Sequence, residues 1–298
     1  MYPIGNLWGL DRKKWLMDMK KQPDVRPCAS PVSADTSVAL ITGASSGIGL
    51  EFACQLAGRG WAVWLVSNDA AGLARAAEKI RGLSSAGCHT TCLDLSLEEA
   101  ADSLYRESIG HGFRVDLLIN DAGIFSFCDV TAVSEQKLQC MLHLHVLTLT
   151  RLCRLFGRDM RQRGSGYILN LSSLSAWLPF PGIALYAATK AYVRTFSKAF
   201  AQEMKPFSVR VLCLCPGGVA TGLYGLPPHL LRLGVRLGIL LTPERLVCRS
   251  LRRLLRKRGL KPVQYVPGWI NRLFIPIYAL CPPALLRRLK KSLSRFEK

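Results

Sequence analysis

The sequence predicts an α/β protein with a doubly wound parallel sheet in a three-layer α/β/α arrangement, built as a single domain with a basic C-terminal extension. Three observations lead to this prediction. Apolar runs alternate with segments of helical spacing over most of the chain. The runs are continuous and do not alternate with polar residues, which is typical of strands covered on both faces. A glycine-rich turn joins the first run to the first helix.

Each predicted strand is an apolar run, and a segment of helical periodicity follows most of them. For the third helix, Ser96 and Glu99 have the spacing of a capping box, so we expect the helix to begin there. The predicted strands are 37–43, 61–67, 89–95, 115–121, 166–173 and 209–216, and the predicted helices are 48–60, 70–83, 96–110, 134–163 and about 186–205.

The 298 residues divide into three parts: an N-terminal arm (1–36), a catalytic domain (37–268) and a basic amphipathic extension (269–298). Hydrophobic residues make up 49% of the chain, which is enough for a large core. The N-terminus has no uninterrupted apolar segment typical of a secretory signal, and no run of about 18 apolar residues could span a bilayer. The 11 cysteines are scattered and form no CxxC pair. We therefore expect reduced cysteines, a cytoplasmic protein and no metal site.

The glycine turn "TGASSGIG" (42–49) predicts a nucleotide site. Its glycines allow backbone amides to approach a pyrophosphate at the start of a helix. The end of the second strand, where an acid or an arginine selects between NAD and NADP, offers only Ser67, Asn68 and Asp69. Asp94 either closes the adenine pocket or simply closes the turn before the next helix. The predicted binding residues in these segments are Gly43, Ser45, Ser46, Gly47, Ile48, Gly49, Asn68, Asp94 and Leu95.

Four further motifs follow in a fixed order: "NDAG" (120–123), "NLSS" (170–173), "YAATK" (186–190) and "PGGVAT" (216–221). With the glycine turn, they make residues 37 to about 225 resemble the classical short-chain dehydrogenase/reductase (SDR) family. The resemblance implies a Rossmann-type fold, a nicotinamide cofactor, and hydride transfer between that cofactor and a carbonyl or alcohol. It also implies a homo-oligomer, a dimer or tetramer assembled through the helices after the fourth and fifth strands.

By position, the resemblance assigns catalytic roles to three residues. Ser173 would hydrogen-bond the substrate oxygen, Tyr186 would donate or accept the proton, and Lys190 would bind the nicotinamide ribose. Elementary electrostatics agrees, because an ammonium group one helical turn from a phenol favours the phenolate. By the same resemblance, the remaining cofactor residues are Asn120, Ala122, Gly123, Tyr186, Lys190, Pro216, Gly217, Val219 and Thr221.

Three positions depart from the family pattern. His145 stands where the family has an asparagine that holds a proton-relay water, so it either takes part in that relay or is a hydrogen-bonded core histidine. Asp121 replaces the second asparagine of the family's N-N-A-G, and it could cap backbone amides equally well. Asn68 replaces an arginine typical of NADP-using relatives. We expect NADP(H) by analogy with reductases and leave NAD(H) open.

Two basic, leucine-rich segments bear on the substrate and its source. The segment 222–243 stands where the family places a substrate-covering loop, so it predicts an apolar substrate, although it could also be an ordinary packed helix. Residues 243–298 hold 15 Lys and Arg against 2 Glu. Mixed with leucines and aromatics, this charge favours peripheral contact with an anionic membrane; a solvated basic helix is the alternative. No nucleic-acid-binding signature accompanies the charge, so we expect no nucleic-acid partner.

Two classes of function remain at this point. The first is a ketone reductase or alcohol dehydrogenase for a steroid or long-chain lipid ketone, with 3-ketosphinganine or a 3-oxoacyl group on an acidic carrier as alternative substrates. The second is a dinucleotide-binding sensor or scaffold without turnover. The serine, tyrosine and lysine of the motifs favour the enzyme.

Overall fold

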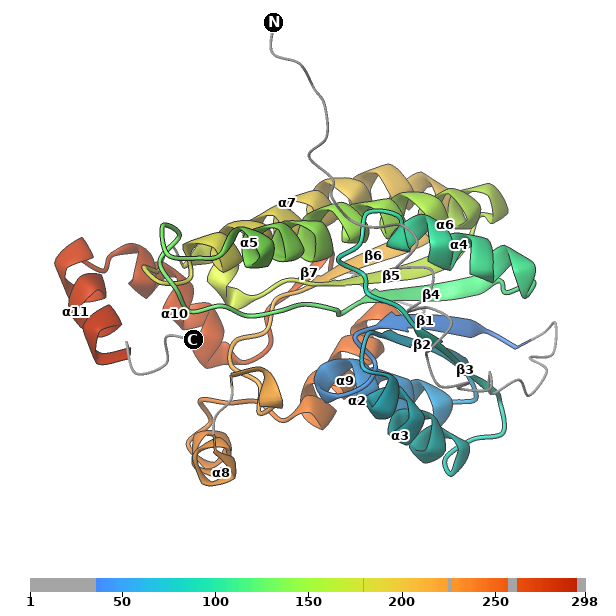
Figure 1. The fold of residues 1–298 in the computed structure, drawn as a ribbon, viewed down its shortest axis with the longest axis horizontal. Coiled ribbons are helices and arrows are strands. Elements are labelled where there is room, and N and C mark those ends of the chain that lie inside the picture. Colours follow the sequence, from blue (N-terminus) through green and yellow to red (C-terminus); the bar gives the residue numbers. More distant parts are fainter. Residues whose placement is uncertain (1–35, 179, 225–226, 257–261, 294–298) are drawn as a thin grey trace, which may run out of the picture.

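The fold is built on a seven-stranded sheet in which every strand is parallel to its neighbours, in the order β3-β2-β1-β4-β5-β6-β7 (Figure 1). The computed structural model describes residues 36–178, 180–224, 227–256 and 262–293. The predicted arm, residues 1–36, lies outside this range except for Thr36. The strands are β1 (Val38–Thr42), β2 (Ala62–Ser67), β3 (Cys88–Cys92), β4 (Val115–Asn120), β5 (Gly166–Leu171), β6 (Val209–Leu214) and β7 (Gln264–Tyr265).

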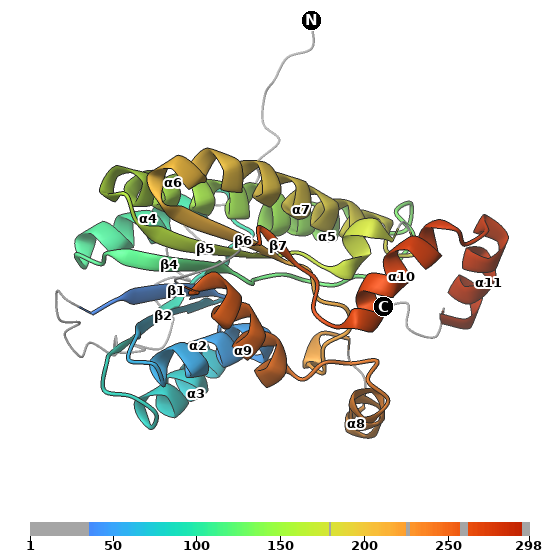
Figure 2. The same cartoon turned by 180° about the vertical axis from the view of Figure 1, so that it is seen from behind.

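Helices cover both faces of the sheet, which confirms the predicted three-layer α/β/α fold (Figures 1 and 2). One face carries α2 (Gly47–Ala57), α3 (Ala70–Arg81) and α9 (Pro243–Leu254), whose apolar residues share a core with β1 and β2. The other face carries α4 (Ala100–Gly110), α5 (Glu135–Leu142), α6 (Leu149–Arg163) and α7 (Ala184–Met204). Every residue of β1 and β2 is buried, as continuous apolar runs require.

The strand order fixes where a ligand can bind. The chain moves outward from β1 to β3 on one side and then returns to β4 on the other side of β1. At this switch point the loops after β1 and β4 diverge to opposite faces, which leaves a crevice at the carboxyl ends of the strands. The glycine turn follows β1 and the "NDAG" motif follows β4, so the topology brings these two motifs together.

Two predicted helices differ from expectation. The helix expected from Ser96 begins at Ala100, because Asp94 Oδ1 accepts hydrogen bonds from both the amide (2.9 Å) and the hydroxyl (2.7 Å) of Ser96, which holds that segment in a turn. The capping-box prediction is therefore wrong. The helix expected over 134–163 is interrupted by a π-helix, His143–Thr148, between α5 and α6.

Three helices gather beyond the carboxyl ends of the strands, at one end of the molecule (Figures 1 and 2). They are α8 (Pro228–Arg236), α10 (Trp269–Ala279) and α11 (Pro283–Leu293). The last two form the described part of the predicted C-terminal extension. Among the described residues, no helix is both long enough and apolar enough to cross a bilayer.

Candidate active site

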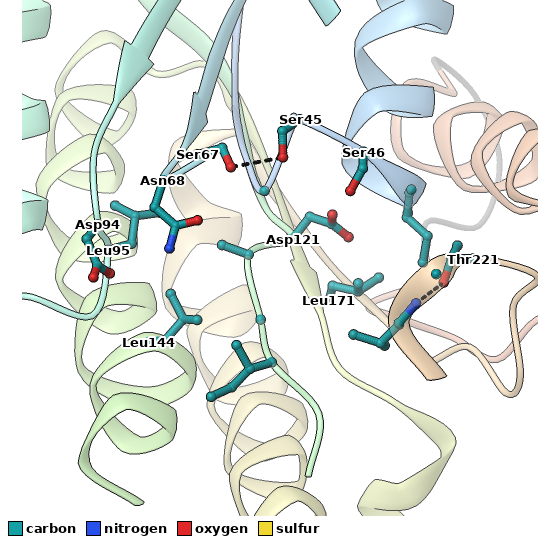
Figure 3. A pocket seen from close by; sticks show the side chains of 18 of the residues that line it. Ser45, Ser46, Ser67, Asn68, Asp94, Leu95, Asp121, Leu144, Leu171 and Thr221 are labelled. Carbon is teal, nitrogen blue, oxygen red and sulfur yellow. Dashed lines mark hydrogen bonds between the residues drawn. The ribbon is translucent and has the colours of Figure 1, made fainter. Parts of the chain in front are cut away.

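A cavity of about 520 Å³ opens at the switch point of the sheet (Figure 3). Its volume is within the usual range of ligand pockets. The loops after β1, β2, β3 and β4 form its walls, together with α7 and the segment after β6. The lining residues are Gly43, Ser45, Ser46, Gly47, Ile48, Ser67, Asn68, Leu93, Asp94, Leu95, Asp121, Ala122, Gly123, Ile124, Leu144, Leu171, Tyr186, Lys190, Thr221, Gly222 and Leu223.

The glycine turn gives this cavity an anion-binding end. Gly43 and Gly47 have positive φ angles of 69° and 59°, and a Cβ atom on Gly49 would lie 2.4 Å from the carbonyl oxygen of Gly43. Within the described structure, Ser46 caps α2 without a side-chain hydrogen bond, so the first amides of the helix face the cavity without that partner. Ser67 Oγ donates to Ser45 Oγ at 2.9 Å and ties β2 to the turn (Figure 3). These features fit a dinucleotide pyrophosphate.

Most of the predicted cofactor residues line the cavity, and five do not. Gly49 packs beneath the turn, Val219 is buried in the core, and Gly217 faces Asn271 on α10. Pro216 is likewise absent from the lining. The fifth, Asn120, points inward: its Nδ2 donates to Asn170 Oδ1 at 2.8 Å, which ties β4 to β5 behind the cavity.

Lys190 is the only lysine among the described residues that line the cavity. It is 5% exposed, and its Nζ donates to the carbonyl oxygen of Leu171, at the end of β5, at 3.0 Å. Ser172 Oγ donates to the backbone carbonyl of Lys190 at 2.7 Å and fixes the register of α7 against β5. Burial lowers the pKa of Lys190 to about 8, an effect that the nearby carboxylate of Asp121 opposes.

Tyr186 lies one turn before Lys190 on α7, is 7% exposed and lines the same cavity. Lys190 Nζ lies 5.7 Å from the centre of the tyrosine ring. The rings of Phe125 and His145 pack edge-on against Tyr186, with centroids 5.1 Å and 5.8 Å away. The phenol is therefore held between two rings and an ammonium group at the wall of the cavity.

Ser173 ends the "NLSS" motif and starts the 3₁₀ helix Leu174–Trp177, where its Oγ accepts a hydrogen bond from the amide of Ser175 at 3.1 Å. This short helix packs against α7, the helix that carries Tyr186. Ser173 is not among the residues that line the cavity. The structure therefore places it beside the site and not on the cavity wall.

His145 sits on the π-helix and is 1% exposed. Its Nε2 accepts a hydrogen bond from the amide of Ile124 at 3.0 Å, and its Nδ1 lies 2.9 Å from Thr189 Oγ1. Burial, reinforced by the charge of Lys190, lowers the pKa of His145 well below its usual value. Thr189 donates its proton to the carbonyl of Tyr186, so a neutral imidazole with the proton on Nδ1 satisfies every partner. Both ring nitrogens of His145 therefore have a hydrogen-bond partner within the protein.

Asp121 lies beneath the glycine turn. A Cβ atom on Gly49 would be 2.8 Å from Asp121 Oδ2, and the amide of Gly49 hydrogen-bonds the carboxyl, as expected for an acid that caps backbone amides. Its Oδ1 is buried and has no hydrogen-bond partner among the described residues. Burial raises the pKa of Asp121 to about 7, against the opposing effects of Lys190 and of the Gly49 amide.

The structure adds apolar residues that the motifs did not identify. Ile124, Leu144, Leu171 and Leu223 line the cavity, and Phe125 packs on Tyr186. Ile124 and Phe125 follow "NDAG" directly, so their place after β4 could have been anticipated. Leu144 could not, because the π-helix sets which side of that segment faces the cavity.

Comparison with known proteins agrees with this geometry. The family model of the short chain dehydrogenases matches residues 37–225, and the chain belongs to this family. A 17-beta-hydroxysteroid dehydrogenase type 3 of Danio rerio is 31% identical over 206 residues, which is 66% of each chain. A very-long-chain 3-oxoacyl-CoA reductase of Coccidioides immitis is 32% identical over 178 residues, 59% of this chain and 51% of the reductase. The chain thus spans about half to two thirds of the length of these relatives.

A short-chain dehydrogenase from Sphingobium yanoikuyae, solved in complex with NADPH, superposes with a TM-score of 0.69 and 25% sequence identity. The superposition covers 83% of this chain and 97% of that structure. The family, the fold and this neighbour together support an oxidoreductase with a nicotinamide cofactor.

The carboxyl of Asp121 should make dinucleotide binding depend on pH. It is protonated below its pKa of about 7 and becomes an anion beside the pyrophosphate site above it. We therefore expect the affinity for NADH, whose phosphates stay ionised, to fall about two- to threefold between about pH 6 and pH 7.5, which corresponds to a pKa rise of about half to one unit on binding. Calorimetric titration at several pH values measures this change.

The matched variant is Asp121→Asn, which should bind NADH with little pH dependence over this interval. A fall above about pH 8 should remain in both proteins, because Lys190 then loses its charge. An equal pH dependence in both proteins below pH 7.5 would show that Asp121 has no part in it.

Proposed function

We propose that this protein is an NAD(P)-dependent ketone reductase or alcohol dehydrogenase for an apolar substrate. The observation that carries the proposal is the pair of Tyr186 and Lys190, both buried, on one face of α7 at the wall of a dinucleotide-sized cavity. A phenol beside an ammonium group can transfer a proton to or from a carbonyl oxygen.

In this proposal each residue acts through the geometry that surrounds it. Tyr186 donates the proton during reduction and accepts it during oxidation. Lys190 favours the phenolate and binds the ribose of the cofactor, and Ser173 orients the substrate oxygen. The nicotinamide supplies or accepts the hydride when it is bound. His145 is a positioning residue, because its Nε2 holds the amide of Ile124 at the cavity wall.

For the cofactor, we propose a preference for NADP(H) over NAD(H). Asp69 stands at the end of β2, but its Oδ1 accepts a hydrogen bond from the amide of Gly72 at 2.9 Å and caps α3. The residues at this point that line the cavity are Ser67 and Asn68, and both are neutral. An uncharged side chain there leaves room for a 2′-phosphate that an acid would repel.

The apolar character of the proposed substrate rests on the cavity and its surroundings. Ile124, Leu144, Leu171 and Leu223 line the cavity, and Phe125 lies against Tyr186. Such a wall suits a steroid or a long-chain lipid ketone, the substrate classes named for the two relatives being a hydroxysteroid and a 3-oxoacyl-CoA. A 3-ketosphinganine or a 3-oxoacyl group on an acidic carrier remains the alternative substrate, and a sensor without turnover is the alternative of another class.

We further propose that the protein is cytoplasmic and docks on the cytoplasmic face of an anionic membrane. It would dock through the end of the molecule that carries the cavity and the helices α8, α10 and α11. Along α10, Trp269, Leu273 and Ile277 recur at intervals of four and are 74%, 55% and 50% exposed. Leu280 just beyond is 84% exposed. Residues at this spacing share one side of a helix, so α10 presents an apolar side to solvent.

The neighbouring helices add to this surface. On α8 and just beyond it, Leu230, Leu233 and Leu237 are exposed at helical spacing, and on α11 so are Leu285 and Leu289. Exposed Arg232, Arg236, Arg272 and Arg287 lie on the same helices. Apolar residues with arginines around them suit a lipid interface, where the arginines contact anionic headgroups. The exposure of these leucines argues against an ordinary packed helix in 228–236.

Assembly into a homo-oligomer, a dimer or tetramer, is also proposed. Leu147 and Tyr192 are 48% and 38% exposed on the helical layer that follows β4 and β5. Tyr192 continues into a ladder of stacked rings with Phe196 and Phe200 along α7. Light scattering on the purified protein measures the oligomeric state, and a monomer at all concentrations would contradict this part.

Substitution Tyr186→Phe tests the central proposal, because it removes the proton donor and keeps the ring packing. We expect kcat/KM for a panel of steroid and lipid ketones to fall at least about 100-fold. Affinity for the cofactor should change less than about twofold. Absorbance of the reduced nicotinamide follows turnover, and its binding is titrated separately.

Tyr192→Phe is the control, since it also removes one phenol hydroxyl from α7, at an exposed position away from the cavity lining. Undiminished turnover in Tyr186→Phe would overturn the assignment of Tyr186. Cofactor binding by the wild-type protein without turnover of any ketone would favour the sensor.

Substitution Asn68→Asp tests the cofactor preference. A carboxylate at this position should weaken NADPH binding about tenfold or more and leave NADH binding within about threefold, because only NADPH carries a 2′-phosphate. Asn68→Ala separates the new charge from the loss of the amide. Equal weakening of both cofactors by Asp would show that Asn68 does not face the ribose.

Membrane docking is tested by vesicle sedimentation. We expect binding to phosphatidylserine-containing vesicles, weaker binding in high salt, and little binding to neutral vesicles. The double change Leu273→Asp with Ile277→Asp should reduce binding about tenfold or more. Ile109→Asp is the control, because Ile109 is 64% exposed at the C-terminal end of α4. Binding that ignores anionic lipid, or an equal loss in the control, would contradict the proposal.

A further inference from the structure

We propose that His89, Glu107 and His111 form a binding site for a divalent metal ion of the zinc type, at the end of the sheet opposite the cofactor cavity. His89 lies near the start of β3, the edge strand, and the other two residues lie at the end of α4. The cofactor cavity opens at the carboxyl ends of the same strands. The two sites are therefore independent in position and in chemistry.

The three side chains offer donors of the kind that zinc takes. One atom from each residue, an imidazole nitrogen or a carboxylate oxygen, lies within 4.8 Å of the other two. His89 Nε2 and Glu107 Oε1 are 2.9 Å apart. Two histidines and one glutamate with a water as fourth ligand are a known zinc set. Ligand atoms in such a tetrahedron are about 3.4 Å apart, given zinc–ligand distances of about 2.1 Å.

The donors are already held near this geometry. Glu107 and His111 are four residues apart, so they lie on the same side of α4 at its last turn. His89 is buried and packs edge-on between Trp64 and Phe113, with ring centroids 5.6 Å and 5.2 Å away. Only His111 must approach, and it is exposed at the C-terminal end of the helix. The exposed side also provides entry for the ion and room for a water.

A partly buried hydrogen-bond network orients the carboxylate. Thr91 Oγ1 donates to Glu107 Oε1 at 2.6 Å, and the indole Nε1 of Trp64 donates to Thr91 Oγ1 at 2.7 Å. Hydrogen bonds of this kind behind a ligand fix its orientation and raise metal affinity. A simple pair of His89 and Glu107 would need neither the hydrogen bond from Thr91 nor a second histidine. The second histidine, His111, has its ring stacked on Phe113, with the ring centroids 5.2 Å apart.

A metal at this position would join the edge strand β3 to α4. Because β3 pairs with a strand on only one side in the described part of the chain, a link to the neighbouring helix would stabilise this edge. The ion is expected to raise the stability of the fold and to take no part in the hydride transfer.

The test titrates metal-free, untagged protein with Zn²⁺ by calorimetry and with Co²⁺ by visible absorption. We expect one Co²⁺ site of low coordination number, and a Zn²⁺-dependent rise in the urea midpoint of unfolding. His111→Phe keeps the ring stack on Phe113 but removes a ligand, so it should weaken binding at least about tenfold and abolish the rise. Thr91→Val should weaken binding about 10- to 100-fold through the orientation of Glu107.

His229→Phe is the matched control, since His229 is an exposed histidine on α8. It should bind like the wild type and keep the rise in the urea midpoint. Equal affinity in His111→Phe and the wild type would overturn the proposal. So would thiolate charge-transfer bands in the Co²⁺ spectrum, which would assign the ion to cysteines.

Discussion

The buried ammonium group of Lys190 is the interaction on which the cofactor site depends. Removing a charge from water costs several kcal/mol unless partners replace the lost hydration. Here the carbonyl of Leu171, at 3.0 Å, and the nearby carboxyl of Asp121 replace part of it. The carbonyl belongs to the end of β5, so α7 has to dock in one register, which also brings Tyr186 to the cavity. Gly123 belongs to the same constraint, because a Cβ atom there would lie 3.6 Å from Nζ and 2.9 Å from His145 Nε2.

The two departures from the family pattern at Asp121 and His145 both lie close enough to this ammonium group for its charge to shift their pKa values. Burial raises the pKa of Asp121 to about 7 and lowers the pKa of His145, while the pKa of Lys190 falls to about 8. Each pKa is therefore shifted in the direction that favours the neutral form of its group, although the attraction between Asp121 and Lys190 opposes this shift. A site with titrations so close to neutrality changes its charge readily when a dinucleotide with its own phosphates enters.

The sequence predicted those features of the molecule that depend on residues close together in the chain. Continuous apolar runs predicted the six long strands, and the glycine turn and "YAATK" motif predicted residues that the cavity indeed brings together. Features decided by distant partners were not predictable. The hydrogen-bond partners of His145 are Ile124 and Thr189, which come from other elements. The start of α4 was mispredicted because Asp94 competes for Ser96, and β7 escaped notice because two residues carry no periodicity.

The two ends of the sheet have acquired different chemistry for a physical reason. At the carboxyl ends, diverging loops leave a cavity. The helices α8, α10 and α11 lie around the same end (Figure 1). These helices carry exposed leucines and arginines. A lipid ketone has low solubility in water, so a surface that rests at the headgroup level would shorten its path through water to Tyr186. The amino end of β3 is different. There Trp64, His89 and Phe113 pack together at the edge of the sheet. The metal site proposed beside them would act only on the stability of the fold.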